Sequence, residues 1–193
     1  MKRISIKHLT SVVIHGLCGL AASSVSAQPP EFDGKIVQQF AADNAYQAVA
    51  VGQESFYAIS NVRLTAHDKN TGRVLQQWDD SSQLSSPLSH LDSGVVLDGK
   101  LYSAHSNYPS WPMTSSVEVW DMDNMQHIES HSFGVMLGSF TWLDRYNGSW
   151  WGAFANYDIV QRGMTEPYGE TRNTVMVQFD DDFEVLQSWS LPA

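Results

Sequence analysis

Three side chains have the types and spacing expected of an acid–base site. His90 and Asp92 are two residues apart, so on a strand they would lie on the same face. An imidazole beside a carboxylate can act as a general base that the acid orients. His105 stands between Ala104 and Ser106, and its ring could serve as a base or bind a ligand. These three are the candidate catalytic residues; a turn-forming pair and a simply hydrogen-bonded histidine are the alternatives.

Amide and aromatic side chains form a second set, suited to binding a small molecule. The motif Ala-x-Ser/Ala-Asn recurs three times and ends in an asparagine each time. Such asparagines either cap turns through their own hydrogen bonds or form a ring of amides that orients hydroxyl or carboxylate groups. Aromatic rings near them offer stacking surfaces. The predicted ligand-binding residues are Asn61, Asn107, Tyr108, Trp111, Asn156, Tyr157 and Asp158.

Metal and cofactor signatures are weak in this sequence. Asp121 begins a stretch like a calcium loop, but Met125 takes a ligand position and no glycine follows. His127 and His131 would lie on one side of a strand, about 13 Å apart, too far to share an ion. No phosphate loop, dinucleotide turn or Gly-x-Ser-x-Gly elbow is present. We predict no cofactor; a Ca²⁺ or Mg²⁺ ion held by carbonyl, Asn and Asp oxygens is left open.

Composition limits the class of protein. The 193 residues are 42% hydrophobic and 17% charged, which predicts one folded domain. The sequence contains 11 Lys and Arg residues and 21 Asp and Glu residues, which gives a net charge of −10. Because no positive field would attract a phosphate backbone, nucleic acid is not expected as a partner.

The first 27 residues resemble an export signal. Basic residues at positions 2 and 3 precede an apolar run over 9–22, and small residues surround Ala27. We predict a signal peptide over 1–27, an extended lead-in over 28–34, and a secreted or periplasmic product with no membrane span. A membrane anchor is disfavoured because His15 interrupts the run, and a lipoprotein because bulky Leu17 precedes Cys18. Cleavage would remove this cysteine, the sole one, so the fold would hold no disulfide.

A repeat indicates the fold. The segment 72–78 is similar to 34–40 and to 183–189, and the three asparagine motifs are spaced by 46 and 49 residues. Between the motifs apolar and polar residues alternate, and turn pairs such as Asp-Gly and Asn-Gly interrupt them, which is typical of antiparallel hairpins. Four strands per unit of about 40–50 residues is typical of a β-propeller blade. We therefore predict an all-β partial β-propeller over 35–193, with three four-stranded antiparallel blades at about 45–81, 90–134 and 138–191, plus one extra N-terminal strand at 35–40.

A propeller with three blades has open sheet edges. Propellers close with roughly four to eight blades, and unpaired edge strands can pair with other chains. The chain is therefore expected to be a piece of a longer propeller or to self-associate through its edges.

The loops then place the candidate residues. In a propeller the loop between the second and third strands and the connection between blades emerge on one face, around the channel. Here these loops are minimal at 61–62 and long at about 106–115 and 156–173, and long loops often bind ligands. We expect a small molecule or an envelope protein to bind this long-loop face without chemistry. The alternative is an isomerase or hydrolase acting on a sugar- or lactone-like metabolite.

Three segments carry a resemblance to a known family. They are His105-Ser106-Asn107-Tyr108-Pro109, Met113-Thr114-Ser115-Ser116-Val117-Glu118 and Phe154-Ala155-Asn156-Tyr157-Asp158. The sequence over about 35–193 resembles a family of uncharacterised exported bacterial β-propeller proteins. The resemblance implies a propeller fold, and some members are labelled cycloisomerase. Members are longer, so this chain is similar to their N-terminal half. No catalytic residue is carried over.

Overall fold

A computed structural model describes residues 31–80, 87–135, 137–160, 164–167 and 169–191. The predicted signal peptide, 1–27, lies outside the described residues. The chain divides into two units, Met1–Val37 and Gln38–Ala193. The described part of the first unit, 31–37, contains no strand or helix, and its Ile36 and Val37 side chains are exposed.

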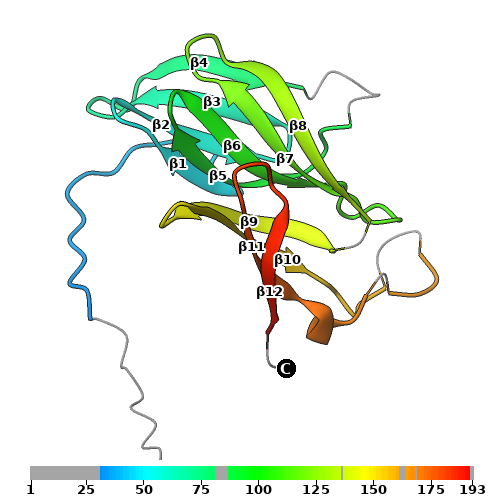
Figure 1. Cartoon of the computed structure of the whole chain (residues 1–193). Helices are drawn as coiled ribbons and strands as arrows, with labels where there is room; N and C mark the ends of the chain where they lie inside the picture. Colours follow the sequence, from blue (N-terminus) through cyan, green and yellow to red (C-terminus); the bar gives the residue numbers. More distant parts are fainter. Residues whose placement is uncertain (1–30, 81–86, 136, 161–163, 168, 192–193) are drawn as a thin grey trace, which may run out of the picture. The chain divides into compact units, whose positions relative to one another are not determined.

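The described residues of the second unit form twelve strands in three sheets (Figure 1). The first sheet is β1 (Ala48–Val51), β2 (Ser55–Ser60), β3 (Arg63–Asp68) and β4 (Val74–Asp79). The second is β5 (Leu91–Leu97), β6 (Lys100–Ser106), β7 (Ser115–Asp121) and β8 (Gln126–Gly134). The third is β9 (Ser139–Tyr146), β10 (Ser149–Ala155), β11 (Val175–Phe179) and β12 (Val185–Ser190). In each sheet the strands pair antiparallel in chain order. The all-β fold with four-stranded antiparallel sheets is therefore confirmed.

Tight turns set the hairpins where the sequence predicts them. Asp98 and Gly99 join β5 to β6 with φ angles of 50° and 75°, and Asn147 and Gly148 join β9 to β10 with φ angles of 49° and 77°. Two successive positive φ angles match the twist of the flanking strands. Apart from the 3₁₀ turn η1 (Thr171–Asn173), the described residues form no helix, and none of them form a helix long and apolar enough to cross a membrane.

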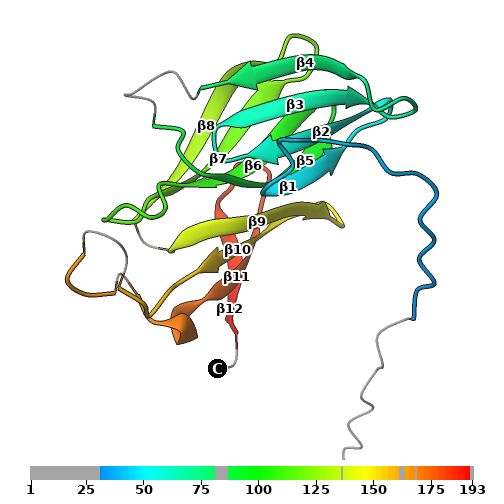
Figure 2. The same ribbon diagram turned by 180° about the vertical axis from the view of Figure 1, so that it is seen from behind.

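The sheets bury their apolar faces against one another. Leu64 of the first sheet and Trp120 of the second belong to one core cluster. The opposite face of the second sheet, with Val117, packs on the third sheet, where Phe140 and Phe154 stack with ring centroids 4.3 Å apart. The first strands of successive sheets are neighbours in space: β1 contacts β5, and β5 contacts β9 (Figure 2). The second sheet is thus covered on both faces.

The predicted extra strand at 35–40 is wrong, because the described residues 31–47 form no strand. Over residues 38–44 the chain contacts the first sheet through side chains. Phe40 stacks on Phe56 with ring centroids 5.6 Å apart, and Asn44 Nδ2 donates a hydrogen bond of 2.9 Å to Thr65 Oγ1. A strand needs the backbone of a neighbour to accept and donate its hydrogen bonds, and residues 35–40 pair with no described strand.

The close approach at Gly152 gives a test of how the aromatic rings pack on the buried face of the third sheet. A Cβ atom on Gly152 would lie 2.5 Å from Phe140 Cε2 and 3.3 Å from Phe179 Cε2, both in buried rings. We expect Gly152→Ala to lower the free energy of unfolding by about 1–3 kcal/mol, because the rings must shift. Urea denaturation measures this change. Ala153→Ser, on the other face of the same strand, should change it by less than about 0.5 kcal/mol; equal effects would contradict the described packing.

Candidate functional site

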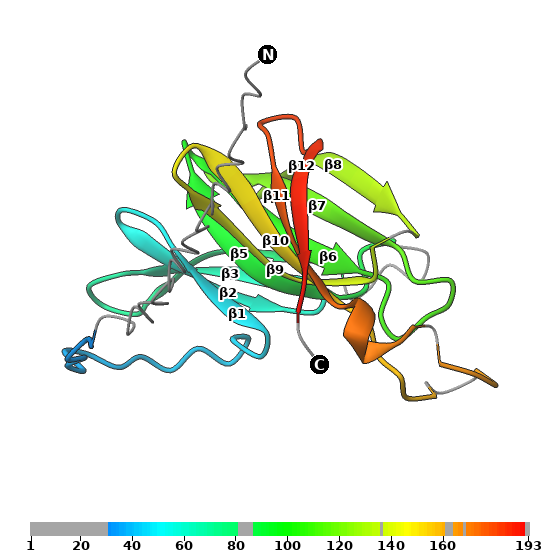
Figure 3. The same cartoon turned by 60° about the horizontal axis from the view of Figure 1, so that its bottom comes forward.

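The two long loops lie on one side of the second unit, near the start of β5. The β6–β7 loop spans 107–114, and the connection between β10 and β11 begins at residue 156. Figure 3 shows both on the same side. His90 directly precedes β5 and Asp92 lies within it. The loops and the strand therefore bring predicted site residues from different parts of the chain towards one another.

The predicted pair His90 and Asp92 is in contact. Nε2 of His90 lies 3.5 Å from Oδ1 of Asp92, and both side chains are mostly buried. The pairing of β5 with β6 shifts by one residue between Leu91 and Gly94, so Asp92 lies in a β-bulge. Bulges change the direction of a side chain. The second carboxylate oxygen of Asp92, Oδ2, is buried and accepts no hydrogen bond.

Burial changes the proton affinity of both groups. It raises the pKa of Asp92 to about 7, and it lowers the pKa of His90. The pKa of Tyr157 is raised as well, first by burial and then by the charge of Asp92. A carboxyl group with a pKa near 7 can both release and accept a proton at neutral pH, which is what acid–base chemistry requires.

Two tyrosines complete this group. The ring of Tyr108, in the β6–β7 loop, lies 5.1 Å from the His90 ring and 5.8 Å from the Tyr157 ring, centroid to centroid. We call His90, Asp92, Tyr108 and Tyr157 the loop-face cluster. All four residues were predicted from the sequence, and the structure brings them together from three separate segments.

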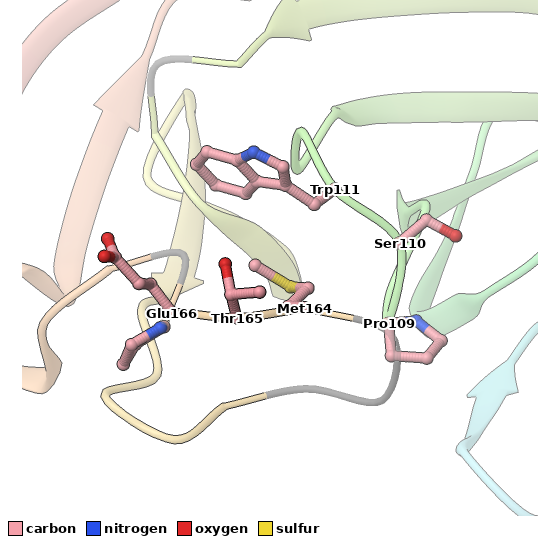
Figure 4. A pocket seen from close by; sticks show the side chains of 7 residues that line it. Pro109, Ser110, Trp111, Met164, Thr165 and Glu166 are labelled. Carbon is pink, nitrogen blue, oxygen red and sulfur yellow. The ribbon is translucent and has the colours of Figure 1, made fainter.

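A cavity of about 650 Å³ is lined by the residues of the β6–β7 loop that follow Tyr108, beginning with Pro109. Figure 4 shows Trp111 of the β6–β7 loop across the cavity from Met164, Thr165 and Glu166. The Trp111 side chain is 57% exposed. An exposed indole beside a cavity of this size can stack on a ligand.

Asn107 holds the β6–β7 loop in shape. Its Nδ2 donates a 2.8 Å hydrogen bond to the carbonyl of Pro112, and its Oδ1 accepts a 2.8 Å hydrogen bond from the backbone N–H of Thr114. The amide therefore closes the loop that presents Tyr108 and Trp111, as the turn-capping alternative expects.

The other predicted amides are also engaged with the protein. Asn156 Nδ2 donates to the carbonyl of Leu137 at 3.0 Å, and Asn61 Oδ1 accepts from Gln47 Nε2 at 2.5 Å. Asp158 is exposed. A ligand-binding role for these three residues stays a prediction.

His105 does not join the loop-face cluster. It is 4% exposed and faces the first sheet. Its Nδ1 lies 2.9 Å from Ser116 Oγ, and its Nε2 accepts a hydrogen bond from the N–H of Ser89 at 3.3 Å. Burial lowers the pKa of His105, although the nearby Glu118 carboxylate opposes this shift. A catalytic role for His105 would therefore belong to a different cavity.

Sequence reasoning missed Glu118 and misplaced a histidine near it. His127 and His131 were expected on one side of a strand, and this is wrong, because a register shift in β8 leaves Ile128 without a partner. His127 Nε2 consequently lies 2.7 Å from Glu118 Oε2, whereas the His131 ring packs on Phe183 of the third sheet. No signal in the sequence marks this bulge.

No family model matches the sequence, and no curated protein matches it. Among similar solved structures is the computationally designed Ika4 protein, which is 14% identical, with a TM-score of 0.44, and the match covers 83% of this chain and 100% of that one. The quinohemoprotein alcohol dehydrogenase ADHIIG from Pseudomonas putida HK5 is 12% identical, with a TM-score of 0.47, and the match covers 75% of this chain and 26% of that one. The computationally designed Ika8 protein is 11% identical, with a TM-score of 0.30, and the match covers 74% of this chain and 61% of that one. None of these similarities identifies a family or a function for this chain.

Metal-binding groups are not assembled in the part of the chain that the structure describes. There, no three His, Cys, Asp or Glu side chains are placed to hold one ion. The Ca²⁺ or Mg²⁺ ion that the sequence leaves open, held by carbonyl, Asn and Asp oxygens, is neither supported nor excluded by this finding.

The raised pKa of Asp92 predicts how stability depends on pH. The folded protein holds this proton up to about pH 7, whereas the unfolded chain releases it near the ordinary value of 3.8. The contribution of Asp92 to the free energy of unfolding is therefore greatest at low pH, and it is lost as the pH rises towards and through 7. We expect Asp92→Asn to raise the free energy of unfolding at pH 8 by up to about 4 kcal/mol, with the gain vanishing near pH 4. Urea denaturation at pH 4, 6 and 8 measures it.

Asp43→Asn, at an exposed position, serves as the control and should show no such pH dependence. An Asp92→Asn gain that is absent, or that is the same at all three pH values, would contradict the described burial of Asp92.

Proposed function

We propose that the three sheets are consecutive blades of a β-propeller, and that the chain is exported after loss of residues 1–27. Four-stranded antiparallel order within each sheet and contact between successive first strands support the first part. The basic and apolar start of the sequence supports the second. The product would act in the periplasm or outside the cell, either as part of a longer propeller or through self-association.

The protein binds a small molecule at the loop-face cluster. The observation that carries this proposal is the buried Oδ2 of Asp92, which accepts no hydrogen bond. Leaving a buried acceptor unsatisfied costs about 1–3 kcal/mol, which a ligand would offset by donating a hydrogen bond to it. The ligand therefore carries a hydroxyl or N–H group.

The surroundings favour a neutral, hydroxylated ligand such as a sugar or a lactone. Tyr108, Tyr157 and Trp111 offer ring faces, on which the C–H faces of a sugar stack, and the tyrosine hydroxyls can exchange hydrogen bonds with its oxygens. The cavity of about 650 Å³ is within the range of small-molecule sites. An envelope protein that inserts a side chain between these loops is the other partner consistent with the exposed Trp111.

Substitution of the exposed indole tests the binding site. Saturation-transfer NMR and calorimetry with a panel of neutral hexoses and aldonolactones should identify a binder. Trp111→Ala should weaken its binding at least about fivefold, since stacking on an aromatic ring contributes about 1 kcal/mol or more. Trp142→Ala is the matched control, because Trp142 is 39% exposed on β9, outside this cavity. Equal losses in both variants, or no binder in the panel, would contradict a sugar- or lactone-like ligand.

A second candidate function is isomerisation or hydrolysis of such a ligand. The specific observation in its favour is the Asp92 pKa of about 7 beside His90. In an isomerisation, the Asp92 carboxylate would take a proton from a carbon of the substrate and return it to a neighbouring atom of the same molecule, so no co-reactant is needed. His90 would hold the carboxylate in position.

Exchange with solvent distinguishes an enzyme from a binder. In D₂O an isomerase whose catalytic carboxyl group exchanges its proton with solvent delivers deuterium to the carbon that receives the proton, which NMR detects. We expect Asp92→Asn to slow this incorporation by at least about 100-fold, and Trp111→Ala to act mainly by raising KM. Because Asp92→Asn is expected to be stable, its inactivity would not reflect unfolding. A wild type that neither incorporates deuterium nor converts the ligand to an isomer or a hydrolysis product supports a binding protein without chemistry.

A further inference from the structure

A second cavity, of about 470 Å³, lies between the first and second sheets, and no residue of the loop-face cluster lines it. Trp78 and Asp80, at the end of the first sheet, line one side of it. Polar side chains of β6, β7 and β8 line the other, among them His105, Glu118, His127 and Ser130. We call this the inter-sheet cavity.

Glu118 carries a buried charge in the wall of the inter-sheet cavity. The residue is 3% exposed. Its carboxylate accepts hydrogen bonds of 2.5 Å from Ser116 Oγ and from Ser130 Oγ, and His127 Nε2 lies 2.7 Å from it. Burial raises the pKa of Glu118, but the hydrogen bonds from His127, Ser116 and Ser130 lower it by more than burial raises it. The pKa of Glu118 is therefore below its ordinary value. Glu118 is therefore a carboxylate at neutral pH.

The protein supplies little permanent positive charge to balance it. Within the described residues, the ion-pair contacts of Glu118 are with the imidazoles of His127 and His105, and with no lysine or arginine. His105 is in its neutral form near pH 7, because burial lowers its pKa. No lysine or arginine of the described residues therefore pairs with the buried Glu118 carboxylate, and a buried charge is costly unless a cation pairs with it.

The inter-sheet cavity also has an aromatic and an apolar side. Trp78 packs its ring edge-on against Trp120, with centroids 5.1 Å apart, and still lines the cavity. Leu88 lines it too and is buried. An indole face attracts a desolvated cation, and an aliphatic chain packs on leucine. The lining thus combines a carboxylate, a ring and an apolar surface.

We propose that the inter-sheet cavity binds a small organic cation, an alkylammonium carried on a short aliphatic chain. The ammonium group pairs with Glu118, the Trp78 ring lies beside it, and the aliphatic part contacts Leu88. A metal ion is a poorer match, because the described residues offer no set of three metal ligands. An ammonium group needs only one more acceptor position on the Glu118 carboxylate, whose two oxygens accept up to about four hydrogen bonds. This site is independent of the function proposed for the loop-face cluster.

Putrescine is a suitable probe, and 1,4-butanediol is its neutral counterpart of the same length. Calorimetry on the full mature protein at pH 7.5 and low salt should detect putrescine binding and at least about tenfold weaker binding of the diol, because an ion pair in a buried site outweighs a neutral hydrogen bond. Glu118→Gln should weaken putrescine binding at least about tenfold. Glu129→Gln, which removes an exposed acid of β8, is the control and should leave it unchanged.

Two further variants keep the test decisive if Glu118→Gln fails to fold. Trp78→Leu retains the charge but removes the ring, and should weaken putrescine binding by about three- to tenfold. Trp111→Ala, at the loop face, should have no effect, which separates this site from the other. Equal binding of putrescine and the diol, unchanged affinity in folded Glu118→Gln or Trp78→Leu, or no putrescine binding at millimolar concentration would each overturn the proposal.

Discussion

Face-to-face packing of the sheets is the constraint on which the rest of this structure depends. The second sheet has a sheet on each side, and six of the seven residues of β7 are buried. On a strand covered on both faces, any polar side chain must find its partners inside the protein. The hydrogen-bonded group around Glu118 follows from this requirement, and so does the density of aromatic rings against the third sheet. The same packing fixes where each loop leaves its sheet.

Local features of the sequence predicted the strands well, because a period of two and a positive-φ turn are encoded within a few residues. The Asp98-Gly99 and Asn147-Gly148 turns are examples. The extra strand at 35–40 was not predictable in this way. Its residues have the pattern of β4, but a pattern specifies the tendency to extend and not the presence of a neighbouring edge. The outcome depends on tertiary contacts that lie far away in the sequence.

The candidate site was partly predictable for the same reason. His90 and Asp92 are close in sequence, and loop length pointed to Tyr108 and Tyr157. Two bulges were invisible, at Asp92 in β5 and at Ile128 in β8. Each changes which face a side chain occupies, and the second one creates the contact between His127 and Glu118. The unsatisfied oxygen of Asp92 is likewise a property of the packed chain, since only burial by other segments makes it costly.

The Asn107 side chain closes the β6–β7 loop at its two ends, and the residues between these ends carry the aromatic rings. One amide joins the carbonyl of Pro112 to the N–H of Thr114, and both partners are backbone groups. The residues between Asn107 and Pro112 contribute no side chain to this closure. Evolution, or an engineer, can therefore exchange the rings at 108 and 111 without dismantling the loop that carries them. The aromatic surface of this loop can thus vary in sequence while the backbone that carries it keeps its closing hydrogen bonds.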